Sequence, residues 1–351
     1  MRIFLAGDYR TGSGPANVTK YYKEYLPHTT LYQKRTGKLA RIPEIAVNTL
    51  RADVVLYSGY SKQVVLGAKL CRLLKKPCVY LMHGCVEYEN RINHEEDEAM
   101  SQTEREIIRL CTKVYAVSPG FCSWLKEYYP EYSDKFDYIT NAIDDDIDEY
   151  RENAVREKGA KGLEDGFDAE NAENSDSLRD KHMIFTVGGG MPRKRITVLC
   201  KAVRLIREKY DESMTLVVAG REGFDSEEIN SYDFVVNKGI VDFKECSRLM
   251  RKAGIFVQNS CFETFGLAPV EAIFNGCPTL LSKEVGALCL LGEFEPCDII
   301  TDCENPGEIA DKIIYILENP NAVRLKHSIN REQNTWKIRS LQLAEKLSQL
   351  Q

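Results

Sequence analysis

Three features that would place the chain in a specialised class of protein are missing from the sequence. No eighteen apolar residues follow one another, so we expect no membrane-spanning helix, and the opening MRIFLAGDYR returns to charge too soon for a signal peptide. The 12 cysteines form neither a C-x-x-C pair nor a zinc-type spacing with histidine, which favours reduced thiols in the cytoplasm. The formal net charge of −6 argues against a general nucleic-acid binder.

Short β-branched and aromatic runs alternate with segments of helical period along most of the 351 residues. This alternation predicts an α/β fold in which parallel sheets are covered by helices. The alternation stops between residues 145 and 181, where the sequence is charged and nearly free of large apolar side chains. We therefore predict two doubly wound domains, residues 1–144 and 182–330, joined by a linker or mobile insertion at 145–181.

The loops that leave the carboxyl ends of parallel strands are the expected places for ligands. The first strand is followed by GDYRTGSGPANV, in which Gly12 and Gly14 permit close approach of a ligand. Pro15 suits a helix that begins near Ala16, and the amides there would meet a phosphate or a sugar. A flexible turn explains such a loop equally well.

A second glycine-rich loop, GGGMPRKRI, follows the strand MIFTV in the second domain. Its three glycines clear space, and Arg193, Lys194 and Arg195 bring fixed positive charge. This combination suits a diphosphate, whereas elsewhere on the surface it would be only a solvated basic turn. Its position directly after a strand favours the diphosphate.

The stretch CFETFGLAPVEA carries the strongest functional signal. Pro269 predicts the start of a helix with Glu271 in its first turn. The amides of residues Thr264 to Leu267 would bind phosphate oxygens, and Gly266 would let the ligand come close. The carboxylates of Glu263 and Glu271 would accept hydrogen bonds from hydroxyls, so a nucleotide sugar fits the stretch. Taken alone, Glu271 would be an ordinary acid near a helix N-terminus.

These motifs resemble those of retaining glycosyltransferases of the GT-B fold, close to glycosyltransferase family 4 (glycosyl transferases group 1). The matching segments are GSGPANVTK near the start, YLMHG at 80–84, YITNAID at 138–144, VGGGMPRK at 187–194, VVAGREG at 217–223 and CFETFGLAPVEAIFNGCP at 261–278. The resemblance implies two Rossmann-like domains that face a central cleft. It also implies transfer of a sugar from a nucleotide sugar, most simply a UDP-sugar, with retention of configuration and with neither a metal nor another cofactor. The C-terminal residues 331–351 are then a helix that packs back toward the first domain.

The resemblance implies roles for individual residues of the second domain. Glu263 would contact the hydroxyls of the donor sugar, and Glu271 would contact those of the ribose. The backbone of residues Phe265 to Leu267 would bind the distal phosphate, and Lys194 matches the family lysine on the diphosphate.

One position departs from the family pattern. The arginine usually found two residues after the strand's valine is Gly189 here, so either Arg193 or Arg195 would supply the missing charge. Gly239 and Ile240, which follow the strand DFVVN, match the segment that cradles the nucleobase.

In the first domain, the resemblance places His83 against the donor sugar and Gly14 in the loop near the phosphates and the transferred sugar. A lone histidine is more often structural, so only its motif supports His83 as a catalytic residue beside Glu263 and Lys194. Retention without an evident carboxylate nucleophile implies front-face attack by the acceptor hydroxyl, with the departing phosphate taking the proton.

Two other functions are consistent with the same residues. A sugar-nucleotide epimerase would share the architecture and the diphosphate site, although Glu263 and the GLAPVEA helix favour a transferase. A catalytically silent nucleotide-sugar-binding partner of another transferase would account for Gly189.

Positive charge gathers between residues 20 and 76, which hold twelve Lys and Arg against three acidic residues. The helical spacing of VVLGAKLCRLLKKP places leucines and valines beside several of these cations, as expected of a face that meets anionic lipid headgroups. We therefore hypothesise peripheral attachment to the inner face of a membrane and a saccharide or lipid-linked saccharide acceptor, as in surface-polysaccharide or glycolipid assembly. An ordinary sheet-covering helix with a solvated basic face is an equal alternative.

Overall fold

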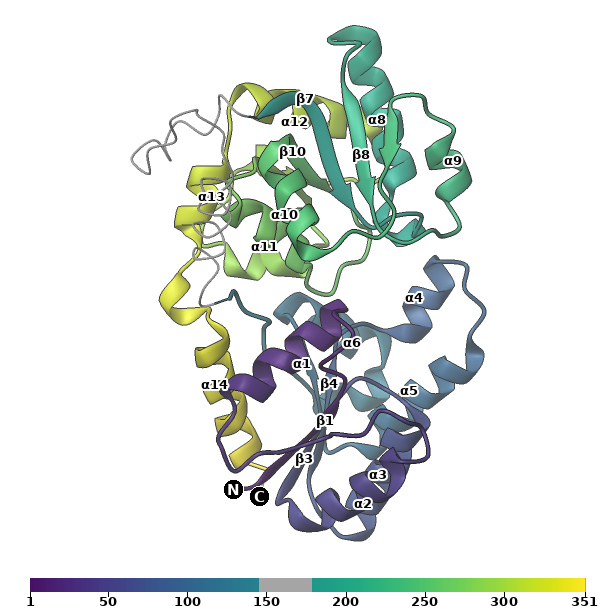
Figure 1. The fold of residues 1–351 in the computed structure, drawn as a ribbon, viewed down its shortest axis with the longest axis vertical. Helices are drawn as coiled ribbons and strands as arrows, with labels where there is room; N and C mark the ends of the chain where they lie inside the picture. Colours follow the sequence, from purple (N-terminus) through teal and green to yellow (C-terminus); the bar gives the residue numbers. More distant parts are fainter. Residues whose placement is uncertain (145–178, 351) are drawn as a thin grey trace, which may run out of the picture. The chain divides into compact units, whose positions relative to one another are not determined.

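The computed structural model describes residues 1–144 and 179–350, which form two compact units. Unit 1 contains the described residues up to Asp144 together with residues 331–350, and unit 2 contains residues 179–330. Each unit is built on one six-stranded sheet in which every strand pair is parallel (Figure 1). The prediction of two doubly wound α/β units is confirmed.

The sheet of unit 1 has the strand order β2-β1-β3-β4-β5-β6. Its four longest strands are entirely apolar or nearly so and are buried, because helices cover both faces of a parallel sheet. The strands are β1 (Ile3–Gly7), β2 (Leu31–Tyr32), β3 (Val54–Ser58), β4 (Cys78–Met82), β5 (Lys113–Ala116) and β6 (Phe136–Tyr138). Only β2, with two residues, was too short to be predicted from the sequence.

The helices of unit 1 are α1 (Gly14–Tyr25), α2 (Arg41–Arg51), α3 (Lys62–Leu73), α4 (Val86–Ile92), α5 (Glu98–Leu110), α6 (Pro119–Tyr128) and α14 (Trp336–Ser348), with 3-10 turns at Pro130–Lys135 and Arg331–Gln333. Three of them start at a serine whose hydroxyl accepts a hydrogen bond from a backbone amide of the first turn, namely Ser13, Ser61 and Ser118. A serine N-cap satisfies one amide that the helix itself leaves without a partner, so these serines set the helix starts.

The sheet of unit 2 has the order β12-β11-β10-β7-β8-β9. Its strands are β7 (Asp180–Val187), β8 (Thr215–Ala219), β9 (Val235–Asn237), β10 (Ala253–Gln258), β11 (Thr279–Ser282) and β12 (Ile299–Ile300). Its helices are α8 (Ile196–Lys209), α9 (Ser226–Asn230), α10 (Phe243–Lys252), α11 (Leu267–Phe274), α12 (Pro306–Glu318) and α13 (Ala322–Ser328), with 3-10 turns at Pro192–Lys194, Gly286–Leu290 and Pro296–Asp298. One apolar core packs α8 and α12 on one face of the sheet, and a second packs α10 and α11 on the other.

Most of the predicted linker lies outside the described residues. Its predicted end at residue 181 is too late, because β7 already begins at Asp180. Arg179 also belongs to unit 2, since its guanidinium donates hydrogen bonds to the carbonyl oxygens of Met250, Arg251 and Ala253 at 3.0–3.1 Å. This arginine satisfies carbonyls at the C-terminal end of α10.

The C-terminal helix α14 is part of unit 1 and packs against α1. The Trp336 side chain is fully buried and stacks on Tyr21, with ring centroids 4.8 Å apart and an interplanar angle of 9°. Its edge meets Tyr22 at 5.6 Å and 82°. These aromatic contacts hold the end of the chain to its first helix.

We expect Trp336→Ala to destabilise unit 1 by about 3–5 kcal/mol, because the substitution removes a buried aromatic side chain and leaves a cavity. Chemical unfolding followed by tryptophan fluorescence measures this, since Trp124, the other tryptophan of the chain, also lies in unit 1. Leu341→Ala on the exposed side of the same helix is the matched control and should change little. Equal effects of the two substitutions would contradict the packing described for α14.

Candidate functional site

The strand order of unit 2 reverses next to β7, which lies between β10 and β8. In a doubly wound sheet, ligands bind beyond the carboxyl ends of the strands at such a reversal. The loops that leave β7 and β10 carry GGGMPRK and CFETFG, and the Cys261 amide donates to the Arg193 carbonyl across 2.9 Å. The two strongest sequence motifs of unit 2 therefore lie side by side where a ligand is expected.

Lys194 and Glu263, which are far apart in the sequence, form an ion pair between these loops. Arg193 lies beside the pair, with Nη1 at 3.6 Å from the same Glu263 oxygen. The three side chains are only 10–15% exposed, so each charge depends on the others rather than on water. Burial alone would raise the pKa of the Glu263 carboxyl, but the charges of Lys194 and Arg193 hold it below its usual value.

The structure distinguishes the two arginines that could replace the family arginine. Arg193 accompanies Lys194 at Glu263, whereas Arg195 pairs with Glu304 and donates to the Pro192 carbonyl at 2.8 Å. Arg193 therefore brings the additional positive charge to the loop between β7 and α8.

Gly189 leaves no room for a side chain in this structure. Its φ of +57° lies in the left-handed region, and a Cβ atom would lie 2.0 Å from the Arg221 carbonyl oxygen. The loop after β7 is thus packed against the loop after β8, and the missing family arginine is explained by this close backbone contact.

The helix of the CFETFGLAPVEA stretch begins two residues earlier than predicted. It starts at Leu267, after Gly266 with φ +87°, so Pro269 is the third helical residue and not the first. Pro269 is tolerated there because the first amides of a helix have no partner inside it. As a consequence, Glu271 lies in the second turn, and the prediction that it occupies the first turn is wrong.

The backbone before α11 is held in place by hydrogen bonds to its carbonyl oxygens. The carbonyl oxygens of Glu263 and Phe265 accept hydrogen bonds from the amides of Gly286 at 3.0 Å and Ala287 at 2.7 Å. Thr264 and Phe265 are buried, and a Cβ at Gly266 would lie 3.1 Å from the Glu263 side chain. The amides at the start of α11 are therefore presented by a loop that is fixed by its carbonyls.

Glu271 differs from Glu263 in having no cation beside it. Within residues 1–144 and 179–350, its carboxylate has no hydrogen-bond or ion-pair partner. Burial raises the pKa of this carboxyl to about 7. A partly buried acid with a raised pKa and no partner is more common at functional sites than elsewhere.

Gly239 and Ile240 follow β9 at the same edge of the sheet. The Gly239 carbonyl accepts a hydrogen bond from the Gly220 amide at 2.8 Å, which joins this segment to the end of β8. The Ile240 side chain is 82% exposed. An exposed apolar side chain here is compatible with the predicted contact to a base.

In unit 1, Gly14 and His83 both follow strands. Helix α1 starts at Gly14 rather than near Ala16, because Ser13 is the N-cap. His83 follows β4, and its Nε2 lies 2.9 Å from the Ser58 Oγ at the end of β3. Burial lowers the pKa of His83 to about 4, so its imidazole is neutral at neutral pH. The sequence reading missed Ser58, although a serine that ends the apolar strand VVLYS is a recognisable signal.

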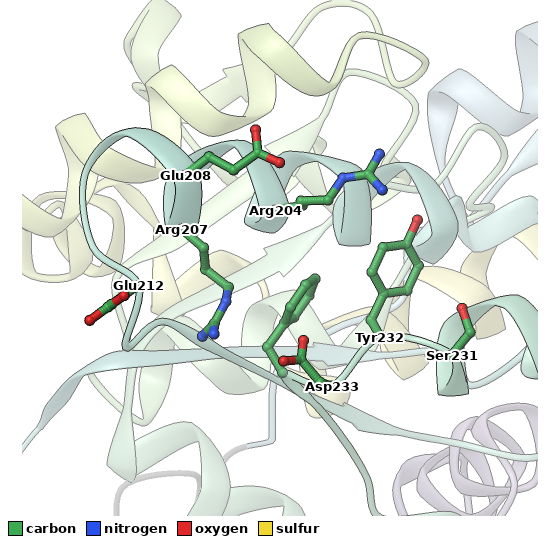
Figure 2. A pocket seen from close by; sticks show the side chains of 8 residues that line it. Arg204, Arg207, Glu208, Glu212, Ser231, Tyr232 and Asp233 are labelled. Atoms are coloured by element: carbon green, nitrogen blue, oxygen red, sulfur yellow. The ribbon is translucent and has the colours of Figure 1, made fainter.

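A surface hollow of about 390 Å³ lies elsewhere on unit 2, between α8 and the residues that precede β9 (Figure 2). Arg204 lies 5.7 Å from the centre of the Tyr232 ring, and Arg207 lies 5.3 Å from that of Phe234. These residues stand at the amino ends of β8 and β9, opposite the edge where the motifs gather. We therefore assign them to packing and not to the site.

Two further observations concern the described residues only. In residues 1–144 and 179–350, no group of three or more His, Cys, Asp or Glu side chains is arranged to hold a metal ion. No helix in those ranges has the length and apolarity needed to cross a bilayer.

Comparison with family models divides the chain at the same place as the fold. The model for Glycosyltransferase Family 4 matches residues 3–147, and the model for Glycosyl transferases group 1 matches residues 168–335. The chain belongs to these glycosyltransferases. The second match contains every motif of unit 2 described above.

Curated relatives are similar over most of their length. The chain is 24% identical over 311 residues to the D-inositol 3-phosphate glycosyltransferase of Paenarthrobacter aurescens strain TC1, which covers 85% of this chain and 72% of the relative. It is 25% identical to the enzyme of the same name from Arthrobacter strain FB24, with coverage of 88% and 71%.

The chain has the GT-B fold, which it shares with glycosyltransferases of known structure. Anabaena HepE in complex with UDP and glucose matches with a TM-score of 0.66 and 16% identity over 99% of this chain and 100% of that one. Sucrose-phosphate synthase from Thermosynechococcus elongatus matches with a TM-score of 0.66 and 16% identity, over 100% of this chain and 99% of that one. WaaG, a glycosyltransferase involved in lipopolysaccharide biosynthesis, matches with a TM-score of 0.59 and 14% identity, over 99% of this chain and 100% of that one.

The raised pKa of Glu271 predicts a characteristic pH dependence. A carboxyl whose pKa is about 7 in the folded chain and near 4.5 in the unfolded chain binds a proton more readily when folded, so the free energy of unfolding falls as pH rises through this range. Glu271→Gln has no carboxyl to titrate at this position, so it lacks this loss of stability. The free energy of unfolding of the variant minus that of the unmodified chain should therefore be larger at about pH 8 than at about pH 4.

Thermal unfolding across this pH range measures the effect, with Glu208→Gln, at an exposed position of α8, as control. A stability difference for Glu271→Gln that does not change with pH would contradict the raised pKa.

Proposed function

We propose that this glycosyltransferase moves a sugar with retention of configuration from a nucleotide-diphosphate sugar, most simply a UDP-sugar, to a saccharide acceptor. The observation that carries the proposal is the cluster of Lys194, Arg193 and Glu263 beside the start of α11. Two cations and the first amides of a helix suit a diphosphate, and a carboxylate next to them suits a sugar hydroxyl. Anabaena HepE, which shares the fold, is described in complex with UDP and glucose.

The cluster suits departure of a nucleoside diphosphate. As the bond between the sugar and the diphosphate stretches, negative charge grows on the phosphate oxygens, where Lys194 and Arg193 would meet it. Glu263 holds Lys194 in place before the donor arrives and would accept a hydrogen bond from the sugar afterwards. Front-face attack by the acceptor hydroxyl without a metal remains what the family resemblance implies.

Glu271 and the backbone before α11 complete the proposed donor site. The Glu271 carboxylate would accept hydrogen bonds from ribose hydroxyls, and the amides of residues Phe265 to Leu267 would bind the distal phosphate. Gly239 and Ile240 would contact the base. The roles of Gly14 and His83 in unit 1 remain what the family resemblance implies. A non-catalytic role loses its main support, because Arg193 supplies a charge that Gly189 cannot.

Helices α2 and α3 support attachment to an anionic membrane. They pack side by side, and each helix buries one face against the rest of the unit. Val47, Leu50, Leu66 and Leu73 lie outside these buried faces and are exposed. Lysines and arginines border these side chains, as at a lipid headgroup surface. Lys76 is not part of this face, because its ammonium donates to the carbonyl oxygens that end α2. A lipid-linked saccharide in polysaccharide or glycolipid assembly would fit such a location.

The donor site is tested by incubating the purified chain with a panel of nucleotide sugars and measuring thermal stabilisation and release of the nucleoside diphosphate. We expect Lys194→Ala to lower turnover on the order of a hundredfold while binding of the nucleoside diphosphate weakens much less, because the charge on the leaving group develops in the transition state. Lys201→Ala, an exposed lysine of α8, is the control.

Equal losses of binding and turnover in Lys194→Ala would reject this role of the lysine. Absence of any stabilisation by the whole panel would reject the nucleotide-sugar donor itself. Interconversion of the donor without an acceptor, seen by mass and NMR analysis of the products, would favour an epimerase.

Membrane attachment predicts sedimentation with vesicles that contain anionic phospholipid, stronger at low salt than at high salt. Lys69→Glu combined with Arg72→Glu on α3 should abolish most of this binding, since each cation near the surface contributes roughly 1 kcal/mol. Lys126→Glu on α6 is the matched control in the same unit. Failure of the unmodified chain to bind at low salt would favour a soluble acceptor.

A further inference from the structure

One buried acid of unit 1 has no part in the site described above. Glu104, in the middle of α5, is 0% exposed. Both of its carboxyl oxygens form hydrogen bonds, Oε1 with the Tyr80 hydroxyl at 2.7 Å and Oε2 with the Val86 amide at 2.7 Å. Tyr80 lies on β4, and Val86 is the first residue of α4. The carboxyl group therefore joins β4 and the start of α4, on either side of the segment His83–Cys85, to α5.

The segment His83–Cys85 is closely packed at other points as well. A Cβ atom at Gly84 would clash with the Glu89 carboxyl, so the Glu89 side chain lies directly on the Gly84 backbone. The Cys85 side chain is buried, and its sulfur lies 3.6 Å from the Tyr129 hydroxyl. The segment directly follows β4, at the edge where a doubly wound sheet binds ligands. Its backbone is thus fixed where a small displacement matters for a ligand.

Glu104 is surrounded by acids and weak acids and not by cations. In the part of the chain that the structure describes, it forms no ion pair, and its sequence neighbour Arg105 pairs with Glu87 instead. The titratable groups that face it are Tyr60, Tyr80, Cys85, Glu87, Glu89 and Tyr129. Burial, together with the charges of Glu89 and Glu87, raises the pKa of Glu104 to about 8, although its two hydrogen bonds oppose the shift. The carboxyl is therefore mostly protonated at neutral pH.

Both protonation states of Glu104 can keep the two hydrogen bonds. The Val86 amide can only donate, so Oε2 accepts from it in either state. In the neutral acid, Oε1 can carry the proton and donate to the Tyr80 oxygen, whereas in the carboxylate the Tyr80 hydroxyl donates to Oε1. The carboxylate, however, buries a charge that has no cation beside it. Displacement of α4, which would admit water to the carboxylate, relieves this cost.

We propose that Glu104 is a positioning residue for the segment His83–Cys85, that it holds β4 and α4 together as an uncharged acid, and that its ionisation weakens the packing of α4. Glutamine has the same shape as the neutral acid, since its carbonyl can accept from Val86 and its amide can donate to Tyr80. Leucine is of similar size and forms neither bond. The inference concerns unit 1 alone, and only its consequence for turnover rests on the proposed function.

The ionisation is measured on the full-length protein by carbon NMR of isotope-labelled glutamate carboxyl groups, with Glu104→Gln to assign the signal. We expect the Glu104 signal to titrate with a midpoint near pH 8. Tyr80→Phe removes the hydroxyl whose hydrogen bond favours the carboxylate, so this midpoint should move to higher pH.

The packing of α4 is measured by the fluorescence of Trp124 on α6, whose ring lies 4.8 Å from the Tyr88 ring of α4. A Trp336→Phe background leaves Trp124 as the one tryptophan of the chain. Between pH 6 and pH 9 we expect the emission to change with the Glu104 titration, and Glu104→Gln should remove this transition. Glu104→Leu should show altered emission already at pH 6.

Glu106→Gln is the matched control, because it changes a second glutamate of α5, which pairs with Arg109 and Lys69 at the surface. This variant should keep the transition of the unmodified protein. The transition itself decides the role of Glu104 if Glu104→Leu folds poorly.

The consequence for turnover is measured by release of UDP from UDP-glucose and UDP-N-acetylglucosamine. The uncharged fraction of Glu104 falls about tenfold between pH 7 and pH 9, so the ratio of kcat/KM of Glu104→Gln to that of the unmodified protein should rise by up to about tenfold over this range. The same ratio for Glu106→Gln should stay constant.

A Glu104 signal that titrates in the usual range of a glutamate, or a fluorescence transition that persists in Glu104→Gln, would overturn the ionisation. Equal emission and equal kcat/KM of Glu104→Leu and Glu104→Gln at pH 7 would overturn the positioning role. A constant kcat/KM ratio for Glu104→Gln would overturn the effect on turnover. If neither nucleotide sugar is used, the proposed donor fails, while NMR and fluorescence still decide the role of Glu104.

Discussion

The buried ion pair between Lys194 and Glu263 is the interaction on which the organisation of unit 2 depends. Charges that are about nine-tenths buried need partners, and removing one partner of such a pair typically costs about 3–5 kcal/mol. The pair can form only if the loops after β7 and β10 meet, which follows from the reversal of strand order beside β7. Glycines then let these loops pack by their backbones, and Arg193 adds a second cation. The strand order thus brings the two loops together, and their backbone packing and paired charges hold them there.

The sequence predicted the parts of this arrangement that depend on local pattern. Runs such as VVLYS and TLVVA identified buried strands, and the glycine, proline and charged residues after them identified the functional loops. Errors arose where a distant contact decides the outcome. The start of α11 was misplaced because the positive φ of Gly266, and not Pro269, ends the preceding loop. The choice between Arg193 and Arg195 depends on Glu263 and Glu304, neither of which is near these arginines in the sequence.

The same reasoning explains why Ser58 and Thr19, whose hydroxyls lie 2.6 Å apart, were not identified from the sequence. Each is a common residue at an ordinary place, one at the end of a strand and the other inside a helix. Their contact depends on the close approach of α1 to β3, which Gly7 permits because a Cβ atom there would lie 2.6 Å from the Ser58 carbonyl oxygen. No local sequence pattern predicts this approach. A serine at the carboxyl end of a buried strand is a signal worth reading together with a polar residue after the neighbouring strand, because parallel strands end at the same edge.

The two units present different chemistry to a ligand. In unit 2 the named residues are charged, and the pKa of Glu263 is held low by cations, which suits phosphates and the charge that they gain as a bond breaks. In unit 1, Thr19, Ser58 and His83 form a neutral row, with the hydroxyls 2.6 Å apart and Ser58 2.9 Å from the His83 Nε2, because burial lowers the pKa of His83 to about 4.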